Sequence, residues 1–166
     1  MENPQPLVYR GGVVPDSLSL ESLKTLRVKK LLTESVTVEE VFDYLRHLHD
    51  PEHPELSLEQ LRVVKIEDIS ISGFNVKVMF TPTIPTCSVA TIIGLTLLAK
   101  LKFCIPEEYK IKVLIAPGTH EQEISVNKQL DDKERVAAAL ENPNLMRMIK
   151  RGVKRADKLP SALSIF

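Results

Sequence analysis

Residues 74–115 read FNVKVMFTPTIPTCSVATIIGLTLLAKLKFCIPEEYKIKVLI, and this stretch decides the fold. Apolar and polar residues alternate over 74–80 and again over 109–115, with the two-residue period of a half-buried strand. Residues 86–103 between them are apolar nearly all round, which is typical of a helix covered on most sides. A strand, a helix and a second strand in this order predict a βαβ unit with parallel strands and a right-handed crossover.

The segment before this unit predicts a β-hairpin and a helix. Residues 62–80 alternate on both sides of the turn residues Ser72-Gly73, with a bulge expected at Glu67-Asp68. Further upstream, Thr37-Val38-Glu39-Glu40 has the form of a capping box and predicts a helix that Asp50-Pro51 ends.

Residues 126–142 and 144–156 predict two more helices, separated by Pro143. The expected fold class is therefore α/β (α+β). It comprises a small three- to four-stranded mixed sheet, with a β-hairpin and a βαβ unit, packed by two to four helices.

The length of 166 residues favours one domain with tails. Residues 1–34 are broken by prolines and a glycine pair, so we expect a flexible N-terminal segment there. Residues 35–149 form the predicted domain, and 150–166 form a basic C-terminal tail. The tail's positive charges suit the end of a helix, because cations interact favourably with its dipole.

The overall composition argues against several classes of function. Lys plus Arg and Asp plus Glu both number 22, so no net charge recruits nucleic acid or an acidic membrane. Two cysteines, Cys87 and Cys104, are too few for a secreted disulfide framework. The most apolar stretch, 89–101, is shorter than the ~20 residues that span a bilayer. The N-terminus resembles neither a signal peptide nor a mitochondrial presequence. We expect a reducing cytoplasmic or nuclear setting.

Cys87 is the most informative residue. Thr86 is the expected N-cap of the helix over 86–103, so the thiol would lie in the first helical turn. Free N–H groups and the dipole favour an anion there, which predicts an accessible thiolate that binds metal or attacks an electrophile. The alternative from the residues alone is a small buried side chain at a helix start.

The predicted topology brings three polar loops to one edge of the sheet. The loops are 50–54, 81–88 and 118–120. The two parallel strands end at this edge, the antiparallel hairpin strand 63–71 begins there, and open α/β sheets place their sites at such an edge. The residues expected at the rim of this site around Cys87 are Asp50, Glu52, His53, Thr83, Thr86, Ser88, Thr119 and His120.

Counting ligands limits what this site binds. Cys104 would lie roughly 25 Å from Cys87 along the helix, and no Cys-x-x-Cys motif is present, so one subunit does not provide a four-thiolate cluster site. The sequence lacks a glycine-rich phosphate loop and a Rossmann fingerprint. We therefore expect no enzyme, although a thiol-dependent enzyme with His120 as base and a purely structural interaction scaffold both remain open.

Four segments resemble one known family. They are 81–91 (TPTIPTCSVAT), 50–54 (DPEHP), 117–120 (PGTH) and 127–142 (NKQLDDKERVAAALEN). Together they are similar to the eukaryotic subunit of the cytosolic iron–sulfur assembly targeting complex, first described in the mitotic-spindle-associated MMXD complex of chromosome segregation. Bacterial domains of the SufT and PaaD types are related. The resemblance runs in order from about Thr37 to Ile149.

This resemblance implies an adaptor that joins a WD40-propeller subunit and a HEAT-repeat subunit. Such a complex delivers iron–sulfur clusters to cytosolic and nuclear apo-proteins, many of them genome-maintenance enzymes. The family's reactive cysteine falls on Cys87, family members tend to form homodimers, and any cluster would be held transiently rather than as a tightly bound cofactor. One departure is Thr86, which replaces the family's usual histidine and puts a metal-ligand role at that position in doubt. Another is the unusually basic tail.

Overall fold

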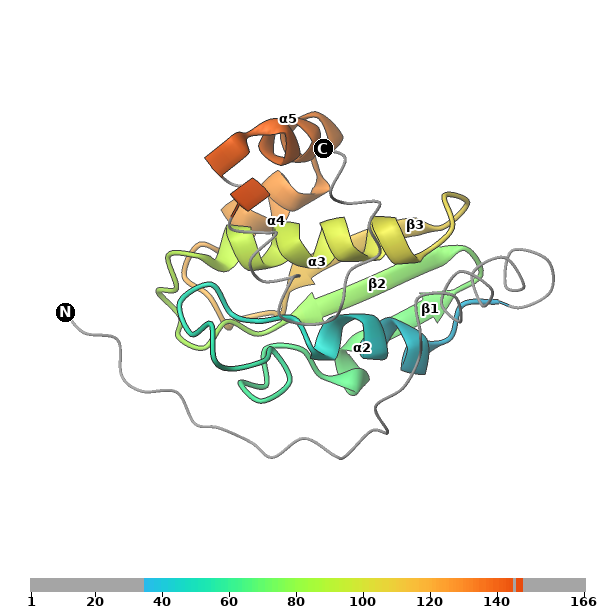
Figure 1. Ribbon diagram of the computed structural model, residues 1–166, viewed down its shortest axis with the longest axis horizontal. Helices are drawn as coiled ribbons and strands as arrows, with labels where there is room; N and C mark the ends of the chain where they lie inside the picture. The colour runs from blue at the N-terminus through green and yellow to red at the C-terminus, as the bar shows by residue number, and fades with distance from the viewer. Residues whose placement is uncertain (1–34, 145, 148–166) are drawn as a thin grey trace.

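The computed structural model describes residues 35–144, 146 and 147. A three-stranded sheet forms its centre, in the order β1-β2-β3 (Figure 1). Strand β1 (Ile69–Ser72) pairs antiparallel with β2 (Asn75–Phe80), and β2 pairs parallel with β3 (Lys110–Ile115). The helices of the described residues are α2 (Val38–Arg46), α3 (Ala90–Cys104), α4 (Glu123–Asp131) and α5 (Lys133–Glu141). The predicted mixed sheet with a hairpin and a βαβ unit is confirmed.

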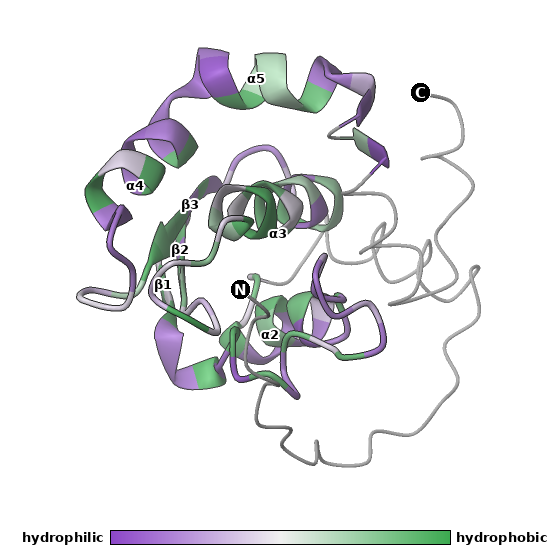
Figure 2. Cartoon of the chain, turned by 90° about the vertical axis from the view of Figure 1, so that its left-hand side faces the viewer, coloured by the Kyte–Doolittle hydropathy of each residue, from purple (hydrophilic) through white to green (hydrophobic). Residues whose placement is uncertain are grey.

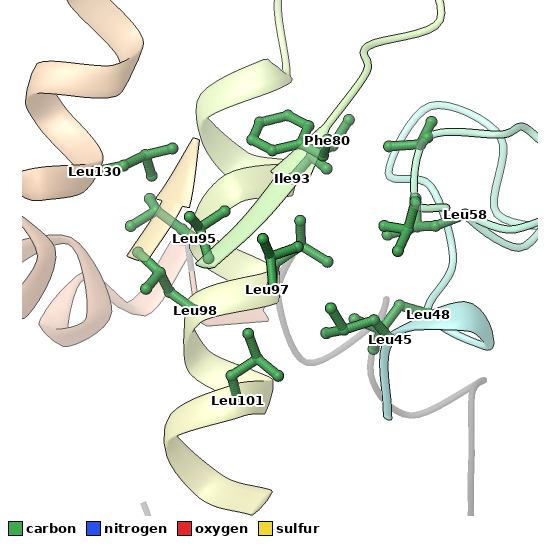
Figure 3. Close-up of a cluster of buried hydrophobic side chains, with 14 of the residues drawn as sticks. Leu45, Leu48, Leu58, Phe80, Ile93, Leu95, Leu97, Leu98, Leu101 and Leu130 are labelled. Atoms are coloured by element: carbon green, nitrogen blue, oxygen red, sulfur yellow. The ribbon is translucent and has the colours of Figure 1, made fainter. Parts of the chain in front are cut away.

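Helix α3 packs on the sheet with α2 on one side of it and α4 and α5 on the other, which explains why it is apolar nearly all round (Figure 2). Its buried Leu95 and Leu98 lie on the side of Leu130 of α4 (Figure 3). Leu97, on another side of α3, lies towards Leu45 of α2. One hydrophobic core therefore joins the sheet, α2, α3 and α4.

The capping box at the start of α2 is confirmed. Thr37 Oγ1 accepts a hydrogen bond from the N–H of Glu40, and the Glu40 carboxylate accepts one from the N–H of Thr37. The helix ends at Arg46, before Asp50-Pro51. Arg46 is largely buried and its guanidinium lies 2.9 Å from the Glu59 carboxylate, which holds the following loop against α2.

The prediction that the first hairpin strand begins near residue 62 is wrong. Strand β1 begins at Ile69, and residues 66–68 form a 3₁₀ turn in place of the expected bulge. The N–H of Asp68 bonds to the carbonyl of Lys65, and the two side chains form an ion pair at 3.0 Å. This local pair closes a turn where a continued strand would have needed an extended backbone.

The predicted start of α3 is also wrong, by four residues. The N–H of Cys87 bonds to the carbonyl of Ile84, which closes a turn with Pro85 at its second position. Proline favours that position because its ring presets φ. The helix therefore begins at Ala90, and its N-cap residue is Val89 rather than Thr86.

The single helix predicted over 126–142 is two helices. Asp132 separates α4 from α5 in an extended conformation (φ −82°, ψ 106°), and its carboxylate accepts the N–H groups of Glu134 and Arg135. The N-cap role of Asp132 outweighs the helical pattern around it. The predicted N-terminal segment 1–34, the tail 150–166 and most of the helix over 144–156 lie outside the described residues.

Helix α4 also covers the outer edge of the sheet. The Asn127 side chain accepts a hydrogen bond from the N–H of Ile115 at 2.8 Å, which satisfies an edge group of β3. Among the described helices, none is long and apolar enough to cross a membrane.

Candidate functional site

The three loops predicted to converge do lie together, at the end of the sheet where β2 and β3 finish. Ser88 Oγ donates to the Glu52 carboxylate at 3.3 Å, which joins loop 81–88 to loop 50–54. The His120 ring contacts the Cys87 carbonyl oxygen, and the N–H of Glu121 bonds to the carbonyl of Pro85. We call these three loops, 50–54, 81–88 and 118–120, the Cys87 edge.

Loop 50–54 folds around the side chain of Asp50. This carboxylate is 2% exposed and accepts hydrogen bonds from the N–H groups of Glu52 (2.7 Å) and His53 (3.0 Å). Aspartate favours such turns because its short side chain reaches the backbone two and three residues on. Asp50 thereby directs Glu52 towards Ser88, whereas the His53 ring lies beside Glu55 at 4.0 Å.

Cys87 is buried, with 4% of its surface exposed. Burial raises the pKa of its thiol, and the Glu52 and Asp50 carboxylates raise it further, while the N–H groups of Val89 and Ala90 lower it. The helix-terminal amides are thus close to the sulfur, as expected for an N-terminal anion site, but burial outweighs them. The accessible thiolate predicted for Cys87 is wrong for this conformation, in which the neutral thiol is favoured.

His120 holds the Cys87 segment through the backbone. Its Nδ1 accepts a hydrogen bond from the N–H of Gln122 at 3.1 Å, so the ring proton belongs on Nε2. Nε2 then donates to the carbonyl oxygen of Cys87 at 3.0 Å. Both ring nitrogens are engaged by backbone groups, so this arrangement does not leave the ring positioned as a base for the Cys87 sulfur.

The other predicted rim residues have local roles. Thr119 donates to the carbonyl of Ala116 within its own turn, at 2.7 Å. Thr86 is exposed and Thr83 is half-buried. Glu123 was missed by sequence reasoning: its carboxylate accepts the N–H of Gly118 at 2.7 Å and fixes loop 118–120 to α4. The sequence marks Glu123 only as an acid near a turn.

The Cys87 edge is poor in metal ligands. Within residues 35–144, 146 and 147, no group of three or more His, Cys, Asp or Glu side chains is arranged to hold a metal ion. Cys104 is the last residue of α3, so the length of that helix, roughly 22 Å, separates it from this edge. A single thiolate together with the nearby carboxylates gives at most part of a coordination shell for iron or a cluster.

Comparison with known proteins places these loops in a defined sequence family. Residues 38–115, which run from α2 to β3, match the family described as "Iron-sulfur cluster assembly protein". The chain is 46% identical to mouse "Cytosolic iron-sulfur assembly component 2B" over 154 residues, covering 91% of this chain and 90% of that protein.

Two further relatives are similar over a shorter range. "MIP18 family protein galla-2" of Drosophila melanogaster is 54% identical over 114 residues, covering 68% of this chain and 72% of that protein. "Protein AE7-like 1" of Arabidopsis thaliana is 54% identical over 112 residues, covering 66% and 72%. The likeness therefore includes most of the described fold.

Proposed function

This chain belongs to the MIP18 family of iron–sulfur cluster assembly proteins, and we propose that it is a non-enzymatic adaptor in cytosolic iron–sulfur protein assembly. The observation that carries the proposal is the 46% identity to a cytosolic assembly component over nine-tenths of both chains. It extends over all three loops of the Cys87 edge.

As an adaptor, the protein joins a WD40-propeller subunit and a HEAT-repeat subunit in a targeting complex. The complex passes clusters to apo-proteins of the cytoplasm and the nucleus, including proteins of chromosome segregation. The engagement of His120 with two backbone groups supports a non-enzymatic role over thiol catalysis, which would require a free base near the sulfur.

Cys87 is the residue we propose to contact the cargo. Its position among three loops gives it carboxylate and hydroxyl neighbours, of which Glu52 and Ser88 are already linked to each other. Because one thiol does not hold a cluster alone, the cluster is bound transiently as cargo, with further ligands from a second copy in a homodimer or from a client. Burial of the thiol implies that the 81–88 loop opens before transfer.

The experiment compares Cys87→Ala with Cys104→Ala in the assembled complex. Two quantities are measured: co-purification of the propeller and HEAT-repeat subunits, and cluster incorporation into an apo-protein client under anaerobic conditions. We expect both variants to assemble and only Cys87→Ala to impair incorporation. Normal incorporation with Cys87→Ala would leave an adaptor without a reactive cysteine, whereas failure of the wild-type chain to bind either subunit would overturn the adaptor itself.

A further inference from the structure

The sheet is covered by helices on one face, and its other face is exposed along all three strands (Figure 2). The strand registers place Asn75, Lys77 and Met79 of β2 beside Lys110, Lys112 and Leu114 of β3 on this face. Strand β1 adds two exposed serines, Ser70 and Ser72. We call this surface the open sheet face.

The open sheet face concentrates positive charge. Lys77 is directly opposite Lys112, and Lys110 lies two residues away on the same face. Like charges in register across two strands destabilise a sheet. Asp131 of α4 lies 3.4 Å from Lys112 and offsets one of them. For Lys77 and Lys110, no ion-pair partner is present among the described residues, and no strand residue of this face is acidic.

The same face becomes apolar at its other end. Met79 and Leu114 are opposite each other and half-buried, one residue before each strand ends. Loop 81–88 follows β2 directly, so the apolar pair is at the end of the sheet nearest the Cys87 edge. The surface therefore has a direction, with lysines far from the Cys87 edge and apolar side chains close to it.

We propose that the open sheet face docks an acidic segment of a partner protein, with its carboxylates over Lys77, Lys110 and Lys112 and an apolar side chain against Met79 and Leu114. Charge complementarity selects this occupant, because the protein's own N-terminal and C-terminal segments carry lysine and arginine clusters that these lysines repel. A protein segment fits better than a nucleic acid, since the face ends in the apolar pair Met79 and Leu114, and the exposed positions within the three strands carry no aromatic residue for base stacking.

The test uses a fluorescent synthetic peptide with a run of glutamates followed by leucines, titrated with the full chain at low salt. The double variant Lys77→Glu/Lys110→Glu replaces two attractions with repulsions. We therefore expect it to bind the peptide about tenfold more weakly, which corresponds to about 1.4 kcal/mol. Lys133→Glu on α5 is the matched control, because Lys133 is exposed and away from the sheet. The Lys133→Glu variant should bind the peptide with the same affinity as the wild-type chain.

Met79→Gln tests the apolar end of the open sheet face separately from its lysine end. It should weaken binding of the glutamate–leucine peptide and leave a peptide without leucines unaffected. The proposal is overturned if the wild-type chain does not bind the peptide, if Lys133→Glu weakens binding as much as the double variant, or if single-stranded DNA binds as tightly as the peptide. The proposal stands on the charge of the sheet, so its failure would leave the role of Cys87 unchanged.

Discussion

The Nε2 atom of His120 lies 3.0 Å from the backbone carbonyl oxygen of Cys87, and this hydrogen bond connects two loops that are 33 residues apart in the chain. The other ring nitrogen accepts the N–H of Gln122. His120 therefore contacts Cys87 through its backbone, and the thiol is buried in the conformation that has this bond.

Two substitutions of His120 separate its two hydrogen bonds. The amide nitrogen of Gln occupies roughly the place of Nε2, so His120→Gln retains a donor for the Cys87 carbonyl. The shorter His120→Asn retains only an acceptor for Gln122. Loss of one hydrogen bond costs about 1 kcal/mol, so His120→Asn should open the Cys87 segment and raise the alkylation rate of the thiol roughly fivefold. His120→Gln should stay close to the wild-type rate.

The rate is measured with iodoacetamide in a Cys104→Ser background, so that only Cys87 reacts. The thermal stability of both variants is measured as well. If His120 had only a general structural role, the two variants would lose the same stability and their Cys87 alkylation rates would be alike. A lower rate in both variants would instead identify His120 as a base for the sulfur and would contradict the holding role.

The raised pKa of Cys87 predicts how its reactivity depends on pH. The thiolate is the reacting form, so the alkylation rate should rise with pH to a midpoint above the ordinary cysteine value of about 8.5. Burial is the main cause and the Glu52 carboxylate adds to it. Glu52→Gln should therefore move the midpoint to lower pH, whereas a midpoint at or below the ordinary value in the wild-type chain would contradict this account.

The same shift affects stability. A group whose pKa is higher in the folded state stabilises the fold below its unfolded pKa, and that contribution is lost as pH rises through the folded pKa. Stability should thus fall at alkaline pH, from the ordinary thiol range upward. Urea unfolding at several alkaline pH values should show a smaller fall in Cys87→Ala than in the wild-type chain.

Asp50 stabilises loop 50–54 of the Cys87 edge. Its buried carboxylate accepts two backbone N–H groups, so Asp50→Ala leaves both without that acceptor, at a cost of about 1–3 kcal/mol. Asp50→Asn retains an oxygen for the same bonds and should cost much less. Urea unfolding measures both, and equal losses would show that the charge of Asp50, rather than its acceptor geometry, holds loop 50–54.

The convergence of the loops was predictable because it follows from topology. Two alternating segments around one long apolar helix define a βαβ unit, and parallel strands necessarily end at the same edge. The first hairpin strand is expected to begin at the same edge, so the topology predicts that the loops of Glu52 and Ser88 converge, as do those of His120 and Cys87. These pairs come from loops far apart in sequence, but the sheet leaves them one place to meet.

The burial of Cys87 was not predictable in the same way. Pro85 suits either the start of a helix or the second position of a turn, and local sequence does not distinguish them. The contacts of Glu121 with Pro85 and of His120 with Cys87 favour the turn, and both come from a loop more than thirty residues away. Asp132 is ambiguous for a similar reason, since an aspartate within a helical pattern caps a new helix only where the chain must change direction.

Gly94 provides the last prediction, because it is where α3 approaches α4. A Cβ atom at this position would lie 2.5 Å from Cδ1 of Leu130, closer than any real contact allows. Alanine is intrinsically the better helix former by about 1 kcal/mol, yet overpacking typically costs about 1–3 kcal/mol. Gly94→Ala should therefore destabilise the protein by roughly 1 kcal/mol in urea unfolding.

The double variant Gly94→Ala/Leu130→Ala tests the cause. Leu130→Ala alone should cost about 2–5 kcal/mol because it leaves a cavity, and the added methyl group at position 94 should fill part of that space. The double variant should then be more stable than the sum of the single effects by about 1 kcal/mol or more. Strict additivity would show that Leu130 is not the clashing partner. Helix α4 begins at Glu123, with Gln122 as its N-cap residue. Gln122 binds the His120 ring and Glu123 binds the N–H of Gly118. A methyl group at position 94 that displaces α4 should therefore also loosen the Cys87 edge and raise the alkylation rate of Cys87.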